Sequence, residues 1–182
     1  MTDQPRSRRL VAAPSRLPED SLAYALVTAA GLIADVVGGL TLTDALATLW
    51  ARRPDTPPAV RGAILDLAYG TLRDYGRQDF ILGQLMQKPL PEPVQSLLRI
   101  ALHRLDTRPD TAHTTVDQAV EGVATLLDGK FKGVANGVLR NALRQAPNTA
   151  SGTPSRMMNG RIQLSYCAVS TRYTSTIDSA KM

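Results

Sequence analysis

The feature that most constrains the fold is the stretch of residues 131–144, FKGVANGVLRNALR. Its apolar residues recur at helical spacing and form one stripe: Val134, Val138, Leu139 and Leu143. This spacing predicts an amphipathic helix that buries one face in a core. Asn136, Arg140 and Arg144 follow one another at intervals of one turn and predict a polar, basic outer edge.

The same helix holds two glycines one turn apart, Gly133 and Gly137. A glycine inside a helix costs roughly 1 kcal/mol relative to alanine. We therefore expect another backbone to come close to this face, where a side chain would not fit.

The rest of the chain has the same helical character. Pro18, Glu19 and Asp20 signal a helix start, Gly38-Gly39 a helix end, and Thr43 an N-cap. Apolar periodicity predicts six earlier helices, over residues 18–37, 41–53, 57–76, 77–86, 94–105 and 112–127. The pattern places Tyr69, Tyr75 and Leu127 inward. Because alternating β and α signals are missing, we expect an all-α helical bundle.

Composition limits the kind of protein. A net charge of +5 and a pI near 9.7 permit a polyanionic partner without requiring one. Cys167 is the only cysteine, so no intrachain disulfide is expected. Residues 23–37 read as a core helix rather than a signal peptide, and no apolar run approaches the roughly 18 residues of a membrane span. A soluble, cytoplasmic protein without membrane contact is expected.

The chain divides into three parts by composition. Residues 1–17 predict a flexible basic arm, residues 18–146 hold the helical domain, and residues 147–182 are rich in Ser and Thr without a core face. Two interpretations of the last part stay open: a disordered tail, or a segment of foreign origin such as a frameshifted end.

No motif for catalysis or cofactor binding stands out. There is no glycine-rich phosphate loop, and one cysteine with two histidines does not supply a typical zinc set. His103 reads as a partly exposed helix residue. Asp117 and Glu121 read as a solvated face or as ion-pair partners of Lys132 or Arg140. We predict no catalytic residue, no metal site and no cofactor in this chain.

The candidate functional residues are basic and come from the arm, the middle of the chain and the last helix. Together they form the predicted RNA-binding set: Arg6, Arg8, Arg9, Arg16, Arg73, Arg77, Lys130, Lys132, Arg140 and Arg144. Such residues can contact phosphates in a salt-dependent way. Ordinary surface charge and a solvated arm are the alternatives.

Several motifs resemble a known family. ANGVLR at residues 135–140 resembles the signature in the last helix of NusB-type RNA-binding domains. YGTLR (69–73), LTLTDALATL (40–49), LLRIALHRL (97–105) and HTTVDQAVEG (113–122) are similar, in order and spacing, to the N-terminal domain of bacterial small-subunit ribosomal RNA cytosine-C5 methyltransferases. The resemblance covers residues 20–145.

The resemblance implies a NusB-like bundle of about seven helices in two subdomains that binds RNA, with small-subunit ribosomal RNA as the expected partner. In that branch the domain joins a catalytic domain that uses S-adenosylmethionine and a cysteine nucleophile. This chain departs there, because Cys167 follows Tyr166 rather than a proline and 35 residues are too few for a Rossmann-like core. We therefore expect no methyltransferase activity from the chain alone.

Two alternative functions stay open. One is a transcription antitermination factor that pairs with a ribosomal protein or a transcription factor. Domains of that kind are similar in carrying arginines near the start of the first helix, whereas this chain has Ser21-Leu22-Ala23-Tyr24 there. The other is a helical interaction module, or a relic of a truncated gene.

Overall fold

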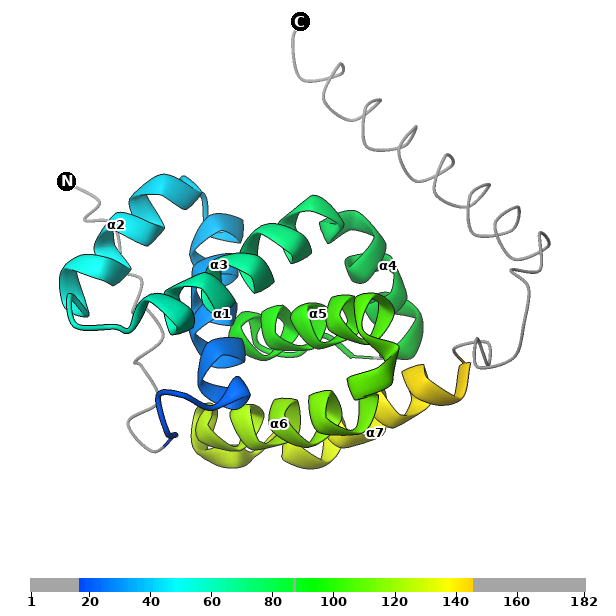
Figure 1. Cartoon of the computed structure of the whole chain (residues 1–182). Helices are drawn as coiled ribbons and strands as arrows, with labels where there is room; N and C mark the ends of the chain where they lie inside the picture. The colour runs from blue at the N-terminus through cyan, green and yellow to red at the C-terminus, as the bar shows by residue number, and fades with distance from the viewer. Residues whose placement is uncertain (1–16, 87, 146–182) are drawn as a thin grey trace, which may run out of the picture. The chain divides into compact units, whose positions relative to one another are not determined.

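The computed structural model describes residues 17–86 and 88–145, which belong to one compact unit (Figure 1). The regular structure of this part is helical throughout, which confirms the all-α prediction. It comprises seven α-helices: α1 (Leu22–Val37), α2 (Leu42–Arg52), α3 (Pro58–Arg73), α4 (Tyr75–Leu85), α5 (Glu92–Thr107), α6 (Ala112–Thr125) and α7 (Lys132–Gln145). Short 3-10 turns, η1 (Pro109–Thr111) and η2 (Leu127–Gly129), join α5 to α6 and α6 to α7. The predictions for the basic arm through residue 16 and for residues 147–182 lie outside the described residues.

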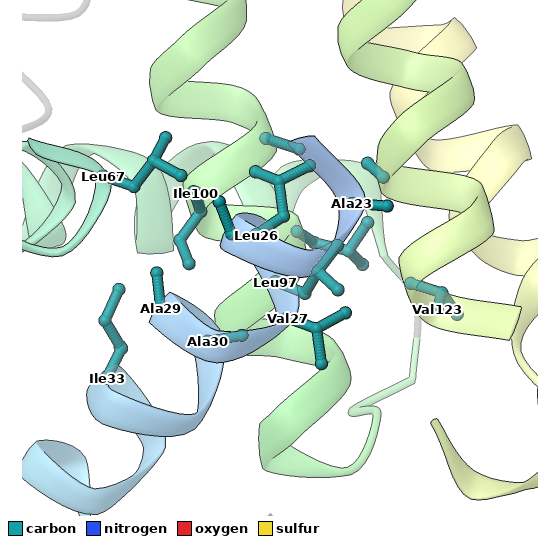
Figure 2. Close-up of a cluster of buried hydrophobic side chains, with 14 of the residues drawn as sticks. Ala23, Leu26, Val27, Ala29, Ala30, Ile33, Leu67, Leu97, Ile100 and Val123 are labelled. Carbon is teal, nitrogen blue, oxygen red and sulfur yellow. The ribbon is translucent and has the colours of Figure 1, made fainter. Parts of the chain in front are cut away.

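Helix α1 is the centre of the core. It packs against α2 and α3 and also against α5 and α6, so it joins the first three helices to the last four. Figure 2 shows Leu26 of α1 beside Ile100 of α5, with Leu67 of α3 on one side and, beyond Val27, Val123 of α6 on the other. Residues Ala23 to Ala30 are all buried. Such all-round burial is typical of a helix in the middle of a bundle.

The helix ends follow local capping chemistry, with two corrections to the sequence prediction. The first helix begins after Ser21, whose side chain accepts a hydrogen bond from the backbone N–H of Tyr24, and not at Pro18–Asp20. The N-cap of α2 is Thr41, not Thr43, since Thr41 Oγ1 accepts from the Asp44 N–H at 3.1 Å. The predicted stop at Gly38-Gly39 is confirmed, because Gly38 caps α1 and Gly39 takes a φ of 99°.

The boundary between the third and fourth helices is earlier than predicted. Helix α3 ends at Arg73, and Asp74 separates it from α4. The inward positions also need correction: Tyr75 is half-buried, but Tyr69 is 51% exposed and Leu127 45% exposed. The buried residue at the end of α6 is Leu126, which directly precedes η2.

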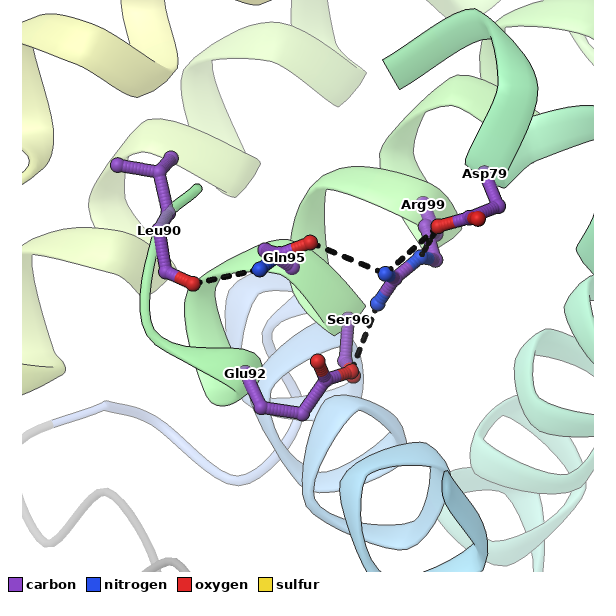
Figure 3. Close-up of polar contacts among 6 residues, drawn as sticks. All are labelled: Asp79, Leu90, Glu92, Gln95, Ser96 and Arg99. Atoms are coloured by element: carbon purple, nitrogen blue, oxygen red, sulfur yellow. Dashed lines mark hydrogen bonds and ion pairs between the residues drawn. The ribbon is translucent and has the colours of Figure 1, made fainter. Parts of the chain in front are cut away.

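A buried arginine ties α4 to α5 (Figure 3). The side chain of Arg99 on α5 is only 5% exposed. It donates hydrogen bonds to Asp79 of α4 at 2.8 and 3.0 Å and to Glu92 at 2.7 Å, and its guanidinium lies 5.0 Å from the ring centre of Tyr75. Burial alone would lower the pKa of Arg99, but the bonds to Asp79 and the charge of Glu92 raise it above its ordinary value. Arg99 is therefore a structural charge with a complete set of partners.

No helix among the described residues combines the length and the apolar character that crossing a membrane requires.

Candidate nucleic-acid interface

The outer face of α7 carries the basic residues that the sequence predicted. Ala135, Val138 and Leu139 face the core and are buried, whereas Lys132, Arg140 and Arg144 are exposed. None of these three forms an ion pair with another described residue. Residues 129–145 contain no Asp or Glu, so the face has cationic charge without an internal counter-charge.

Contrary to the sequence prediction, Gly133 and Gly137 of α7 do not face a neighbouring backbone among the described residues. A Cβ added at Gly133 or at Gly137 would have no described atom within 4 Å. The predicted close approach of another backbone is therefore wrong within the described part of the chain, and Val134, predicted to be inward, is 47% exposed. The reason is that α7 meets α4, α5 and α6 along the side that carries Ala135, Val138 and Leu139, extended by the half-buried Ala142 and Leu143, and the glycines lie off this side. The glycines instead make the exposed face flat between the basic side chains.

The other predicted basic residues lie elsewhere. Lys130 is exposed in the turn before α7 and adds a positive charge two residues before the start of that helix. Arg73 is exposed at the end of α3, and Arg77 of α4 pairs with Asp106 at 3.2 Å. Helix α3 packs against α1, α4 and α5 and not closely against α7, so Arg73 lies apart from the last group, whereas α4, which carries Arg77, does contact α7. Arg6, Arg8, Arg9 and Arg16 lie outside the described residues.

Sequence reasoning missed Tyr69 as a surface residue. It lies one turn before Arg73 on the outer face of α3, together with Gly62 and Asp66, and it is 51% exposed. An exposed aromatic ring beside an arginine can stack on an unpaired base while the arginine contacts a phosphate. The signal was present in the sequence, since Asp66 and Arg73 flank Tyr69 at i−3 and i+4 and mark that face as polar.

Helices α1, α3 and α5 also enclose a groove of about 550 Å³, hereafter the α1–α3–α5 groove. Its walls come from the first turns of α1, the first half of α3 and the end of α5. Arg104 and Arg108 stand at the α5 side, and Arg108 lies 4.0 Å from Asp66 of α3. Burial lowers the pKa of Arg104, and the charge of Arg108 lowers it further, against the opposing charges of Asp66 and Asp110.

The described residues offer little for catalysis. They contain no group of His, Cys, Asp and Glu that could hold a metal ion. Asp117 and Glu121 are exposed, and Glu121 accepts from Gln118 rather than pairing with Lys132 or Arg140, so the solvated-face interpretation holds. His103 is half-buried on α5, with Nδ1 3.4 Å from Asp74. The arrangement suits contact with a polyanion better than acid–base chemistry.

The helical bundle and its basic outer face define a class: an all-α domain with a cationic surface for a partner. The chain belongs to the NusB family, whose model matches residues 25–144.

Its curated relatives include proteins named ribosomal RNA small subunit methyltransferase B. That of Sodalis glossinidius is 36% identical over 90 residues, which are 48% of this chain and 21% of the relative. That of Proteus mirabilis is 33% identical over 121 residues, 64% of this chain and 28% of the relative. The protein of Pseudomonas putida is 36% identical over 95 residues, 50% of this chain and 22% of the relative.

The chain thus spans between a fifth and somewhat over a quarter of the length of these relatives. No solved structure matches it. The family confirms the resemblance that the ANGVLR and YGTLR motifs carried.

Proposed function

We propose that this domain binds RNA, and small-subunit ribosomal RNA in particular. The observation that carries the proposal is the outer face of α7, where Lys132, Arg140 and Arg144 are exposed and free of carboxylates. The similarity to proteins named for small-subunit ribosomal RNA supports the choice of RNA.

The physical basis is electrostatic. Cationic side chains that neutralise phosphates release condensed counterions, so binding weakens as the salt concentration rises. Exposed arginines on a flat helix face can reach a phosphate backbone without first breaking an internal ion pair. Gly133 and Gly137 have no side chains, so they leave room for an RNA strand to approach the arginines.

In this proposal the domain contributes binding and orientation, and no chemistry. The region shared with the methyltransferase-named relatives is a small part of their length. We accordingly propose that the chain neither binds S-adenosylmethionine nor transfers a methyl group, and that it works in the cytoplasm, where ribosomal RNA is processed.

The test is a titration of the full chain with small-subunit ribosomal RNA fragments over a series of salt concentrations. Changing both Arg140 and Arg144 to Gln should lower the slope of log affinity against log salt by roughly 1.4, from about 0.7 for each lost phosphate contact on single strands. Thermal stability should stay unchanged, since both side chains are exposed.

Arg52→Gln on α2 makes the same type of charge change on a helix that packs closely only against α1, and it should leave the slope nearly unchanged. If the unaltered chain binds no fragment at low salt, the proposal is wrong. If the Arg140 and Arg144 variant loses thermal stability while Arg52→Gln does not, the arginines of α7 are structural.

A further inference from the structure

The α1–α3–α5 groove contains an arginine whose hydrogen bonding is incomplete. The Nε atom of Arg104 is buried, yet it has no acceptor among the described residues. A buried donor without a partner costs free energy, because it has lost water and gained nothing in exchange. Arg99, five residues earlier on the same helix, shows the contrast, since its guanidinium is satisfied by Asp79, Glu92 and Gln95.

A second arginine stands one turn further along α5. Arg108 also lines the groove, and its nearest carboxylate, Asp66, is 4.0 Å away and largely exposed. The two guanidinium groups carry like charges that repel one another: burial lowers the pKa of Arg104, and the charge of Arg108 lowers it further. An anion placed between the two side chains would accept hydrogen bonds from the guanidinium groups and relieve this repulsion.

The floor of the groove is apolar. Leu22 and Ala25 of α1 and Val60, Ala63 and Leu67 of α3 line it. At about 550 Å³ the groove has the size of a small-molecule site, for which about 300–1,000 Å³ is typical. An aromatic base fits such a floor, because both of its faces are apolar and its edge is polar.

The rim near the start of α1 is acidic. Glu19 and Asp20 line it, and both are exposed. A carboxylate accepts hydrogen bonds from an exocyclic amine, such as N4 of cytosine, and repels a carbonyl edge. The groove is therefore lined by cationic donors, apolar side chains and carboxylate acceptors.

We propose that the α1–α3–α5 groove holds one unpaired nucleotide of the bound RNA, with its phosphate on Arg104 and Arg108 and an amine-bearing base over the apolar floor. The inference rests on the proposed function, since the nucleotide belongs to an RNA strand that the domain binds. It assigns a site that lies apart from the basic face of α7.

The test uses the full chain and cytidine 5′-monophosphate, followed by NMR up to millimolar nucleotide. We expect shifts confined to residues of the groove, weaker binding of uridine 5′-monophosphate, and weaker binding still of inorganic phosphate. Arg104→Gln should reduce the affinity for the cytidine nucleotide about tenfold or more, which is the loss expected for a charge-assisted hydrogen bond.

A second variant blocks the groove without touching its charges. A Cβ at Gly62 meets no described atom within 4 Å, so Gly62→Leu fills the groove and is compatible with folding. It should abolish nucleotide binding and keep or raise the thermal stability. Gly83→Leu on α4 is the matched control, since residue 83 is equally open and lies outside the groove, and it should bind the nucleotide as the unaltered chain does.

The outcomes separate this inference from the proposed function. If Gly62→Leu binds the cytidine nucleotide unchanged, or if no shift appears at millimolar nucleotide, the groove assignment is wrong, even where RNA still binds through Arg140 and Arg144. Equal affinity for phosphate and for both nucleotides would also overturn it, by showing an anion site without base recognition. Weaker RNA binding in Gly62→Leu, with the salt slope from α7 retained, would support it.

Discussion

The imidazole of His103 on α5 lies directly against the backbone of Gly70 on α3. Its Nε2 atom is 2.6 Å from the point that a Cβ on residue 70 would occupy, a distance too short for two unbonded atoms. The other ring nitrogen, Nδ1, is 3.4 Å from a carboxylate oxygen of Asp74. The glycine of the YGTLR motif is therefore required by the packing of α3 on α5, in contrast to the glycines of α7.

Replacing Gly70 by alanine should destabilise the domain. The added methyl group forces the half-buried His103 ring away from α3, and overpacking of this kind costs about 1–3 kcal/mol. Chemical denaturation of the variant, compared with His103→Ala and with the double variant, measures the effect. The double variant should lose less than the sum of the two single losses, because the two sites are in contact.

Gly62→Ala is the control on the same helix. Residue 62 has open space around it, so only the gain in helix propensity remains, up to about 1 kcal/mol. If Gly70→Ala is as stabilising as Gly62→Ala, the contact with His103 is looser than the structure shows.

A second prediction concerns the charge buried between α4 and α5. Asp79→Ala removes an acceptor that binds Arg99 through two donors, at 2.8 and 3.0 Å. Because the guanidinium is only 5% exposed, water does not replace the lost partner, and we expect a loss of about 1.5–3 kcal/mol in unfolding free energy. Asp66→Ala, which breaks the exposed 4.0 Å pair with Arg108, should cost less than about 1 kcal/mol. Equal losses in the two variants would contradict this ranking.

The helices could be predicted from the sequence because their signals are local. Apolar periodicity located α5 and α6, and Gly38-Gly39 gave the end of α1. The N-cap of α2 was predicted two residues too late. Thr41 has Asp44 three residues on and bonds to its side chain and backbone N–H, whereas Thr43 has Leu46 at that spacing. The order and spacing of the motifs were then sufficient to predict the family.

The environment of single residues could not be predicted in the same way. Gly133, Gly137 and Gly70 all lie within helices, but only Gly70 faces a neighbouring side chain. Whether a helix face meets another helix depends on packing between distant segments, which periodicity does not encode. The α1–α3–α5 groove was missed for the same reason, because Arg104 and Val60 come together only in the folded chain.

The open face of α7 gives a third prediction. Gly137→Ala should raise the stability by up to about 1 kcal/mol, because it removes the helix penalty of glycine and meets no atom. Gly137→Leu should fold equally well but weaken RNA binding, since its side chain stands between the strand and the arginines. Thermal melts and RNA titrations of the two variants test this. A large loss of stability in Gly137→Leu would instead support the close packing of this face that the sequence predicted.

A fourth prediction follows from Asp35 on α1. Burial raises the pKa of its carboxyl above the ordinary 3.8, and the charge of Arg52 only partly opposes this. The folded chain therefore holds this proton more tightly than the unfolded chain. The resulting stability is fully present below pH 3.8 and is lost as the pH rises through the folded-state pKa.

Asp35→Asn should consequently raise the melting temperature at pH 7, and its advantage should shrink as the pH falls toward 4. Melting curves at half-unit pH steps measure this trend. Asp117→Asn, on the exposed face of α6, makes the same charge change and controls for net charge. If the stability advantage of Asp35→Asn grows as the pH falls, the pKa of Asp35 is lowered rather than raised by folding, and the prediction is wrong.

The exposed ring of Tyr69 gives the last prediction. If it stacks on an unpaired base, Tyr69→Ala should weaken RNA binding by about 1–3 kcal/mol, and Tyr69→Phe should bind nearly as well as the unaltered chain, because stacking needs the ring and not the hydroxyl. Neither change should affect stability, since about half of the side chain is in solvent. Tyr75→Ala is the contrasting variant: its ring lies under the buried Arg99, 5.0 Å from the guanidinium, so stability should fall instead. Fluorescence titration with single-stranded RNA, alongside thermal melts, separates the two effects. Unchanged RNA affinity in Tyr69→Ala would confine the interface to the basic face of α7.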